Sequence, residues 1–226
     1  MENFDSELWK LINNTEDYIQ YGCISGRKLP DMMIRREEPD SLEKIASQIA
    51  ECRKCRLCEK RKNVVPGMGV LNPDVMVIGE GPGGDEDAQG LPFVGKAGQY
   101  LDKWLVAIGL SRDTNCFIGN VVKCRPPMNR DPQPAEIAAC LPYLERQIAL
   151  IRPKFILTVG RISSGVLSGQ EAGIGRLRGR TYSFKGIPLI PTYHPSAVLR
   201  DQTLRKPVWE DLKRLRTELE EIKNVH

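Results

Sequence analysis

The run VMVIG at Val75–Gly79, followed at once by the glycine-rich stretch EGPGG at residues 80–84, decides the fold. Every residue of the run is apolar or glycine, without polar alternation, which is typical of a strand buried on both faces. Three later segments have the same character: Cys116–Val121 (CFIGNV), Phe155–Gly160 (FILTVG) and Ile187–Thr192 (IPLIPT). The chain therefore carries four predicted buried strands.

Helical patterns separate these strands. We expect helices over residues 98–109, 134–151 and 208–222 and a short one from 162. Strands that alternate with helices predict an α/β fold, with a central parallel four-stranded sheet flanked by helices on both faces as three α/β/α layers.

The first 40 residues differ in character from the rest. Residues 4–21 fit a helix, and the stretch from 22 to 39 reads as a linker with Gly, Pro and alternating charge. Asp40 and Glu43 then resemble an N-cap and its partner, opening a helix to about Glu51. We therefore expect an N-terminal helical extension and linker at 1–40 and one main domain at 41–226.

Net charge also differs between the first 40 residues and the rest of the chain. Residues 1–40 have nine acidic and five basic residues, a net charge of −4, whereas the whole chain of 226 residues carries +4. The remainder thus carries +8, which fits a polyanionic partner for the body, although a solvated surface fits as well. The acidic extension suits a protein partner.

Membrane insertion is not expected. No apolar run approaches the roughly 18–20 residues of a membrane span. Residues 1–14 are polar and acidic, unlike the apolar region of a secretion signal. We expect a cytoplasmic protein.

Polar residues follow the predicted strands. Glu80 comes directly after the first strand, Asn120 ends the second, and His194 follows the fourth. In parallel sheets ligands bind beyond the carboxyl ends of the strands, so these side chains are expected to converge on one pocket. The glycines at 79–84 allow close backbone approach to a ligand, but they match neither a Walker loop nor a dinucleotide fingerprint.

Each of these side chains has a structural and a functional interpretation. Phe93 is either a core aromatic or a platform on which a base stacks. Asn120 either caps a turn or offers its paired donor and acceptor to a uracil edge. His194 is either a hydrogen-bonded structural residue or a donor to an oxyanion. The carboxylates of Glu80, Glu86 and Asp87 suit a metal site, a positioned water or a solvated turn.

The chain has seven cysteines, and an odd number argues against a disulfide framework in a protein expected to be cytoplasmic. Cys52 and Cys55 form a C-x2-C pair that holds one metal from a tight turn, and Cys124 and Cys140 lie downstream. Spacing leaves both zinc and an iron–sulfur cluster open, and it leaves Cys58 ambiguous. Cys23 and Cys116 are expected to be structural.

Four ordered motifs now give a resemblance. They are GEGPGxxED at 79–87, PFVGKAG at 92–98, NVVKCRPPxNR at 120–130 and HPSAVLR at 194–200. Together they resemble the family 4, iron–sulfur, uracil-DNA glycosylases over about residues 46–220. The resemblance implies a monofunctional DNA-repair enzyme that flips uracil out of single- or double-stranded DNA, hydrolyses its glycosidic bond and leaves an abasic site.

The resemblance also implies residue roles. A 4Fe–4S cluster falls on Cys52, Cys55, Cys124 and Cys140, and Cys58 falls outside the pattern. Catalysis is assigned to Glu80, Glu86, Asn120 and His194, and substrate binding to Gly79, Gly81, Phe93, Asn120, Asn129 and His194. The DNA contacts are Arg125, Arg130 and Arg200, with Val198 and Leu199 as a wedge in the base stack. We expect a monomer.

Two features depart from the family pattern: Gly119 stands where Thr or Ser is expected, and the extension at 1–40 is unusually long. Two other functions fit parts of the sequence. A metal-dependent nuclease or hydrolase would use Glu80, Glu86 and Asp87. A non-catalytic uracil- or DNA-binding module would keep the four-cysteine metal site as a scaffold.

Overall fold

The computed structural model describes residues 2–21 and 39–224 of the chain. It divides into two compact units, residues 1–39 and 40–226, each described by itself. In the first unit, α1 (Glu2–Tyr21) is the helix predicted from residue 4. Residues 22–38 of the predicted linker, with Cys23, lie outside the described part.

The second unit is built on one mixed sheet with the strand order β1-β3-β2-β4-β6-β5. The strands are β1 (Met68–Gly69), β2 (Val75–Gly79), β3 (Cys116–Asn120), β4 (Phe155–Val159), β5 (Tyr182–Phe184) and β6 (Ile187–Thr192). The four predicted strands pair in parallel, and β1 and β5 add antiparallel edges. The expected count of four is therefore corrected to six, since edges of two and three residues are too short to leave a sequence pattern.

Helices connect the strands. They are α2 (Leu42–Glu51), α3 (Gly84–Gln89), α4 (Lys96–Ala107), α5 (Pro134–Ile151), α6 (Arg161–Ser168), α7 (Ile174–Leu177), α8 (Pro195–Arg200) and α9 (Arg205–Asn224), with 3-10 turns η2 (Arg56–Glu59), η3 (Pro127–Asn129) and η4 (Gln202–Leu204). None of the helices in the described part has the length and apolar character of a membrane span.

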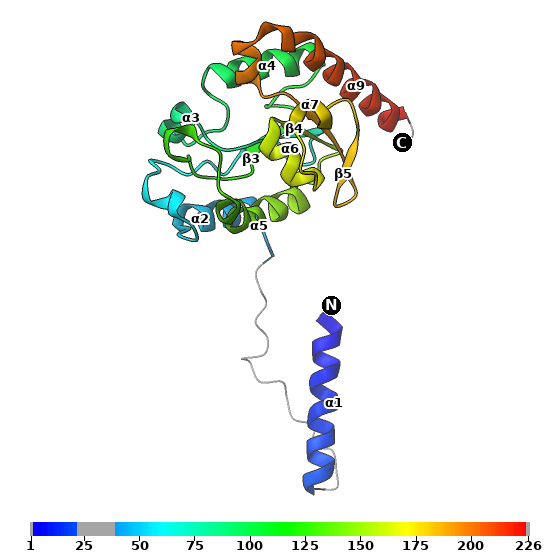
Figure 1. Cartoon of the computed structure of the whole chain (residues 1–226). Helices are drawn as coiled ribbons and strands as arrows, with labels where there is room; N and C mark the ends of the chain where they lie inside the picture. The colour runs from blue at the N-terminus through cyan, green and yellow to red at the C-terminus, as the bar shows by residue number, and fades with distance from the viewer. Residues whose placement is uncertain (1, 22–38, 225–226) are drawn as a thin grey trace. The chain divides into compact units, whose positions relative to one another are not determined.

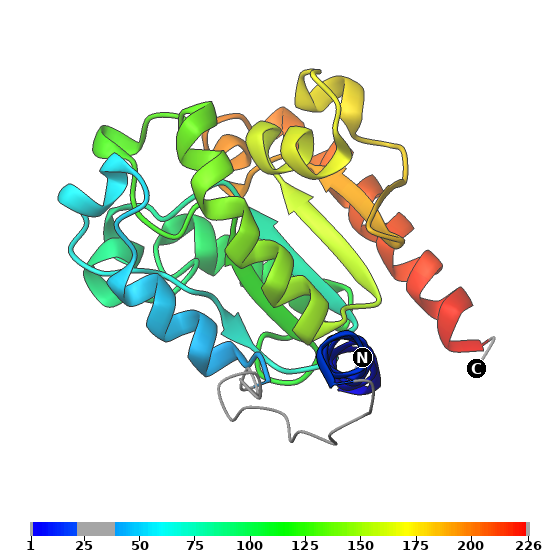
Figure 2. The ribbon, with the colours of Figure 1, turned by 90° about the horizontal axis from the view of Figure 1, so that it is seen from below.

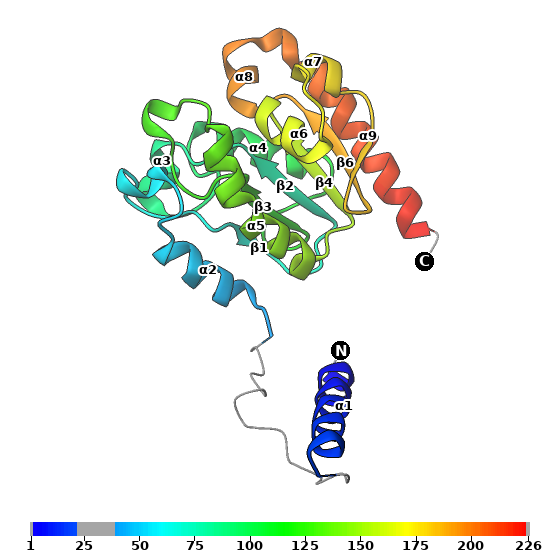
Figure 3. The same cartoon turned by 60° about the horizontal axis from the view of Figure 1, so that its bottom comes forward.

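Alternate side chains of the buried strands feed two apolar cores. Val75 and Val77 of β2 pack in one core with residues of α4 and α9. Met76 and Ile78 pack in the other with residues of α5 and α6. Figure 1 shows α4 and α9 on one side of the sheet and α2 and α5 on the other, and Figure 2 and Figure 3 show α5 lying across the strands. Burial on both faces explains why the strands lack polar alternation.

The start of α2 differs in detail from the prediction. Ser41, not Asp40, is the N-cap, and its hydroxyl accepts the backbone N–H of Lys44 at 3.1 Å. Asp40 instead pairs with Arg146 of α5 at 2.6 Å. Asp40 therefore ties the start of the second unit to α5.

Candidate active site

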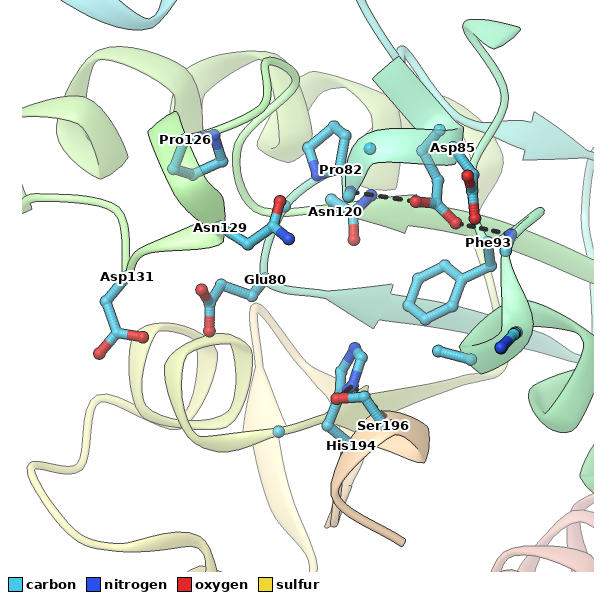
Figure 4. A pocket seen from close by; sticks show the side chains of 18 of the residues that line it. Glu80, Pro82, Asp85, Phe93, Asn120, Pro126, Asn129, Asp131, His194 and Ser196 are labelled. Atoms are coloured by element: carbon cyan, nitrogen blue, oxygen red, sulfur yellow. Dashed lines mark hydrogen bonds between the residues drawn. The ribbon is translucent and has the colours of Figure 1, made fainter. Parts of the chain in front are cut away.

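A pocket of about 510 Å³ opens where the parallel strands end. Its lining comes from the segments that follow β2, β3, β4 and β6, as the positions of Glu80, Asn120 and His194 predicted. Figure 4 shows these three side chains and Phe93 around one shared space. Gly81 and Asn129 also line it.

Asn120 forms the floor of the pocket. It is the last residue of β3, opposite Gly79 in the parallel register, and only 1 % of its surface is exposed. Its side-chain oxygen Oδ1 is buried and accepts no hydrogen bond from the described residues. Buried polar atoms are nearly always paired, so this oxygen is available to accept a hydrogen bond from a molecule in the pocket.

Phe93 is held in a strained conformation beside Asn120. Its φ of 53° lies in the left-handed region, which is unusual for an aromatic residue. The guanidinium of Arg112 donates to the carbonyls of Pro92 and Phe93, each at 3.1 Å. The ring lies 5.8 Å from the His194 ring, between centroids. The contacts from Arg112 hold this strained backbone in place and so fix the position of the ring at the pocket.

Gly79, assigned to substrate binding, lies behind the pocket instead of lining it. A Cβ at Gly79 would meet Asn120 Oδ1 at 2.5 Å and Phe93 Cζ at 2.6 Å. The missing side chain lets the ring and the amide approach each other across the strand end. Its role is thus close packing.

Gly79→Ala is expected to lower the free energy of unfolding by about 1–3 kcal/mol, because the added methyl overpacks the site. Gly119→Ala is the matched control, on the neighbouring strand, where the new Cβ would meet nothing nearer than 3.8 Å. Denaturant unfolding of both variants measures the difference. Equal effects at the two glycines would contradict this account of Gly79.

His194 is a neutral donor. Its Nδ1 accepts the backbone N–H of Ser196 at 3.1 Å and lies 2.8 Å from the Ser196 hydroxyl. An accepting Nδ1 leaves the proton of the neutral imidazole on Nε2. Burial, and secondarily the positive charge of Arg200, lowers the pKa of His194 to about 4. The ring therefore offers an uncharged Nε2–H at neutral pH.

Glu80 lies on the side of the pocket opposite Phe93 and is only partly buried. Burial and, to a smaller extent, the negative charge of Asp131 raise the pKa of Glu80 to about 7, although the positive charge of Arg161 opposes the shift. Asp131 and Arg161 form an ion pair with each other. A carboxylate near neutral pKa is suited to proton transfer.

Glu86, unlike Glu80, is hydrogen-bonded to the backbone of two loops. Its carboxylate accepts the backbone N–H groups of Gly83 at 3.1 Å and of Val94 and Gly95 at 3.0 Å. It therefore ties the glycine loop to the segment that carries Phe93. Asp87 accepts the N–H of Lys62 at 2.9 Å. The three carboxylates thus have separate partners, which disfavours the nuclease interpretation.

The predicted wedge has to be corrected. Val198 is fully buried in the core with α4, so it cannot insert into a base stack, because withdrawing it would open the core. Leu199, next to it on α8, is 41 % exposed. Arg200 is exposed on the pocket rim.

The two other predicted DNA contacts have internal partners. Arg125 donates to Asn129 Oδ1 at 2.8 Å. Arg130 lines the pocket and pairs with Glu136 of α5 at 2.7 Å. Both guanidiniums brace the loop between β3 and α5.

A second, small pocket gathers five cysteines. Cys52, Cys55, Cys124 and Cys140 line it, and Cys58 lines it too. Among the described residues, no three Cys, His, Asp or Glu side chains lie close enough together to form a site for a single metal ion. Cys116 is buried in the core, as predicted.

The donors around these sulfurs suit an anionic metal centre. Arg61 Nη1 donates to Cys124 Sγ at 3.1 Å, and the Lys123 backbone N–H donates to Cys140 Sγ at 3.3 Å. Burial raises the pKa of the Cys140 thiol to about 11, so a thiolate there needs a cation to hold it. The residues present therefore fit a thiolate-bound metal or cluster.

Four residues around the first pocket were missed in the sequence: Arg112, Asp131, Arg161 and Ser196. Arg161 had a usable signal, since it follows the end of the third predicted strand. Gly160 before it has a φ of 100°, and a Cβ there would lie 3.3 Å from His194 Cβ. Ser196 stands inside the motif at 194–200 but had no role assigned, and Arg112 and Asp131 act through backbone contacts or pairing, which leave no motif.

Comparison with known proteins assigns the class. A family model described as "Uracil DNA glycosylase superfamily" matches residues 66–213, and the chain belongs to this superfamily. It is 47% identical over 186 residues to a type-4 uracil-DNA glycosylase of Sulfurisphaera tokodaii, covering 78% of this chain and 84% of that one. It is 40% identical over 189 residues to the type-4 uracil-DNA glycosylase of Thermotoga maritima, covering 82% and 97%.

Proposed function

We propose that this chain is a type-4 uracil-DNA glycosylase that excises uracil from DNA and leaves an abasic site for base-excision repair. The superfamily membership and the similarity to type-4 uracil-DNA glycosylases support the activity. Its substrate is single- or double-stranded DNA that contains uracil. It is a monofunctional hydrolase acting as a monomer, with the glycosylase domain at 41–226 in three α/β/α layers.

The observation that carries the proposal is the buried, unpaired Oδ1 of Asn120. A uracil edge offers N3–H to this oxygen and O4 to the Nδ2 donor of the same amide. Cytosine has a bare N3 and an amine at the corresponding positions, so it would leave the buried acceptor unmet. Mismatched donors and acceptors in such a site are rejected strongly.

The neighbouring residues then supply the chemistry. Uracil stacks on Phe93 and presents O2 to the Nε2–H of His194, which stabilises negative charge as the C1′–N1 bond breaks. Glu80 accepts a proton from the water that adds to the oxocarbenium-like C1′. Glu86 acts by holding the loops in place, as its three backbone contacts suggest.

DNA reaches the pocket over the rim near α8. Leu199 fills the space left by the flipped base, and Arg200 contacts a phosphate, with Arg125 and Arg130 supporting the opposite loop. The exposure of Leu199 and Arg200 supports these roles. Flipping costs a few kcal/mol, least where the base pair is already weak.

Cys52, Cys55, Cys124 and Cys140 would hold a 4Fe–4S cluster. When bound, the cluster serves as a structural crosslink between the segment after α2 and the segments around α5. The N–H donors on Cys124 and Cys140 support an anionic centre. A brown protein that contains iron is expected, whereas a colourless protein that contains zinc would contradict the cluster.

The N-terminal unit is proposed as a site for a protein partner. Its helix α1 exposes Leu11 and Ile19, which are 66 % and 80 % exposed. Residues 1–40 also carry a net charge of −4, whereas the whole chain carries +4.

Asn120→Ala tests the base-reading role directly. We expect single-turnover uracil excision to fall by roughly 100-fold or more, because the variant removes both contacts to the uracil edge. Affinity for undamaged DNA of the same sequence should stay within about threefold, since Asn120 is buried below the rim. Equal losses in excision and in undamaged-DNA binding would overturn the role.

A further inference from the structure

Lys123 is a buried cation that the mechanism above does not use. Its side chain is 1 % exposed and lies on the segment between Asn120 and Cys124. Its Nζ donates to the backbone carbonyl of Asn120 at 2.9 Å, inside the protein. Lysine is rarely buried to this degree without a partner, so the position needs a reason.

No carboxylate accounts for this ammonium. Among the residues that the structure describes, no Asp or Glu oxygen lies within ion-pair distance of Lys123. Its Nζ donates to the Asn120 carbonyl instead. The backbone N–H of Lys123 also donates to Cys140 Sγ at 3.3 Å. A buried cation is stable only beside negative charge, which thiolates of the cysteine centre would provide.

We propose that Lys123 is a positioning residue that couples the four-cysteine centre to the uracil-reading Asn120. One end of the residue lies against Cys140, and the other fixes the Asn120 carbonyl. Fixing this peptide group fixes the direction in which the Asn120 amide enters the pocket. The inference rests on the proposed glycosylase function and deepens it, because it assigns the cysteine centre an influence on base reading.

Arg61 provides a matched comparison. Its guanidinium donates to Cys124 Sγ at 3.1 Å and to the Ala50 carbonyl at 2.8 Å, and neither bond involves Asn120. Arg61 and Lys123 therefore both donate to a cysteine sulfur, Arg61 through its guanidinium and Lys123 through its backbone N–H. Only Lys123 also contacts the uracil-reading residue, because its Nζ donates to the Asn120 carbonyl.

The experiment compares Lys123→Met and Arg61→Met as full-length, metal-loaded proteins. Methionine keeps most of the lysine volume but cannot donate to the carbonyl. At equal iron content per chain, we expect K123M to lose roughly 10- to 100-fold in the single-turnover excision rate at saturating enzyme. Its affinity for undamaged DNA should not change, and R61M should keep the rate within about threefold of wild type. Lys123→Arg, which keeps a charged donor, should recover part of the loss.

Other results would overturn the inference. An iron-loaded K123M with the wild-type rate would do so, as would an R61M that loses as much as K123M. If K123M folds without its metal, Lys123→Gln is used in its place. The glutamine amide nitrogen is one bond closer to the backbone than the lysine Nζ, so it does not reach the Asn120 carbonyl. The same two results with this variant would overturn the inference. Failure of the glycosylase proposal itself is distinct, since the wild-type protein would then release no uracil.

Discussion

Replacing Glu80 by Gln is expected to lower the single-turnover rate of uracil excision by about 100-fold or more. The variant should also lose the acid limb of the pH–rate profile. Both effects follow if the Glu80 carboxylate takes a proton from the attacking water. Glu80 is the partly buried carboxylate of the pocket whose pKa stands near neutrality.

The direction of the pH dependence follows from this pKa. Burial and the charge of Asp131 raise the pKa of Glu80 to about 7, so the carboxyl is largely protonated below that pH. A base must be ionised, and about a tenth of the groups remain ionised one pH unit below the pKa. We therefore expect kcat/KM to rise with pH through about 7 and then to level off, whereas E80Q stays flat.

Two variants separate Glu80 from its neighbours. Asp131→Asn removes a like charge, so the pKa of Glu80 falls and the limb moves to lower pH. Glu86→Gln loosens the loops that it ties but should keep the limb. An E80Q variant that keeps the acid limb, or that loses less than about tenfold, would show that this carboxylate does not activate water.

His194→Leu is the second large effect. Removing the Nε2–H donor should lower the excision rate by about 100- to 1,000-fold, the range measured for single oxyanion donors. Binding of undamaged DNA should change little, because the ring is half-buried and lines the pocket. Single-turnover excision beside a DNA-binding titration measures the two quantities.

Ser196→Ala is the control for His194. The backbone N–H of Ser196 still fixes the tautomer at 3.1 Å, so only the hydroxyl contact is lost and the rate should fall less than about tenfold. Since the pKa of His194 lies at about 4, its titration should leave no limb near neutral pH. An H194L variant with the wild-type rate would remove the ring from the mechanism.

The site was predictable where it depends on strand ends. Glu80, Asn120 and His194 each follow a long apolar run, and parallel strands bring such ends to one edge. The same runs predicted that these four strands pair in parallel, because burial on both faces removes polar alternation, but they did not predict the order of the strands. Short edge strands such as β1 carry too few residues to leave a pattern.

Other features depend on contacts that sequence spacing does not encode. Val198 stands in a motif beside Leu199, yet the turn of α8 sends it into the core. Arg112 shapes the Phe93 loop through backbone carbonyls 19 and 20 residues away. Asp131, in the segment before α5, pairs with Arg161, the first residue of α6. The raised pKa of Glu80 could therefore be recognised only from the three-dimensional arrangement.

The most direct measurement is release of the free base. The full-length protein is incubated in EDTA with an oligonucleotide containing one uracil, and with a matched one containing cytosine. Free uracil is quantified before strand scission is tested with alkali. We predict free uracil from the first oligonucleotide alone, with strands intact until alkali is added. Strand cleavage before alkali, or binding without release of uracil, would contradict the account.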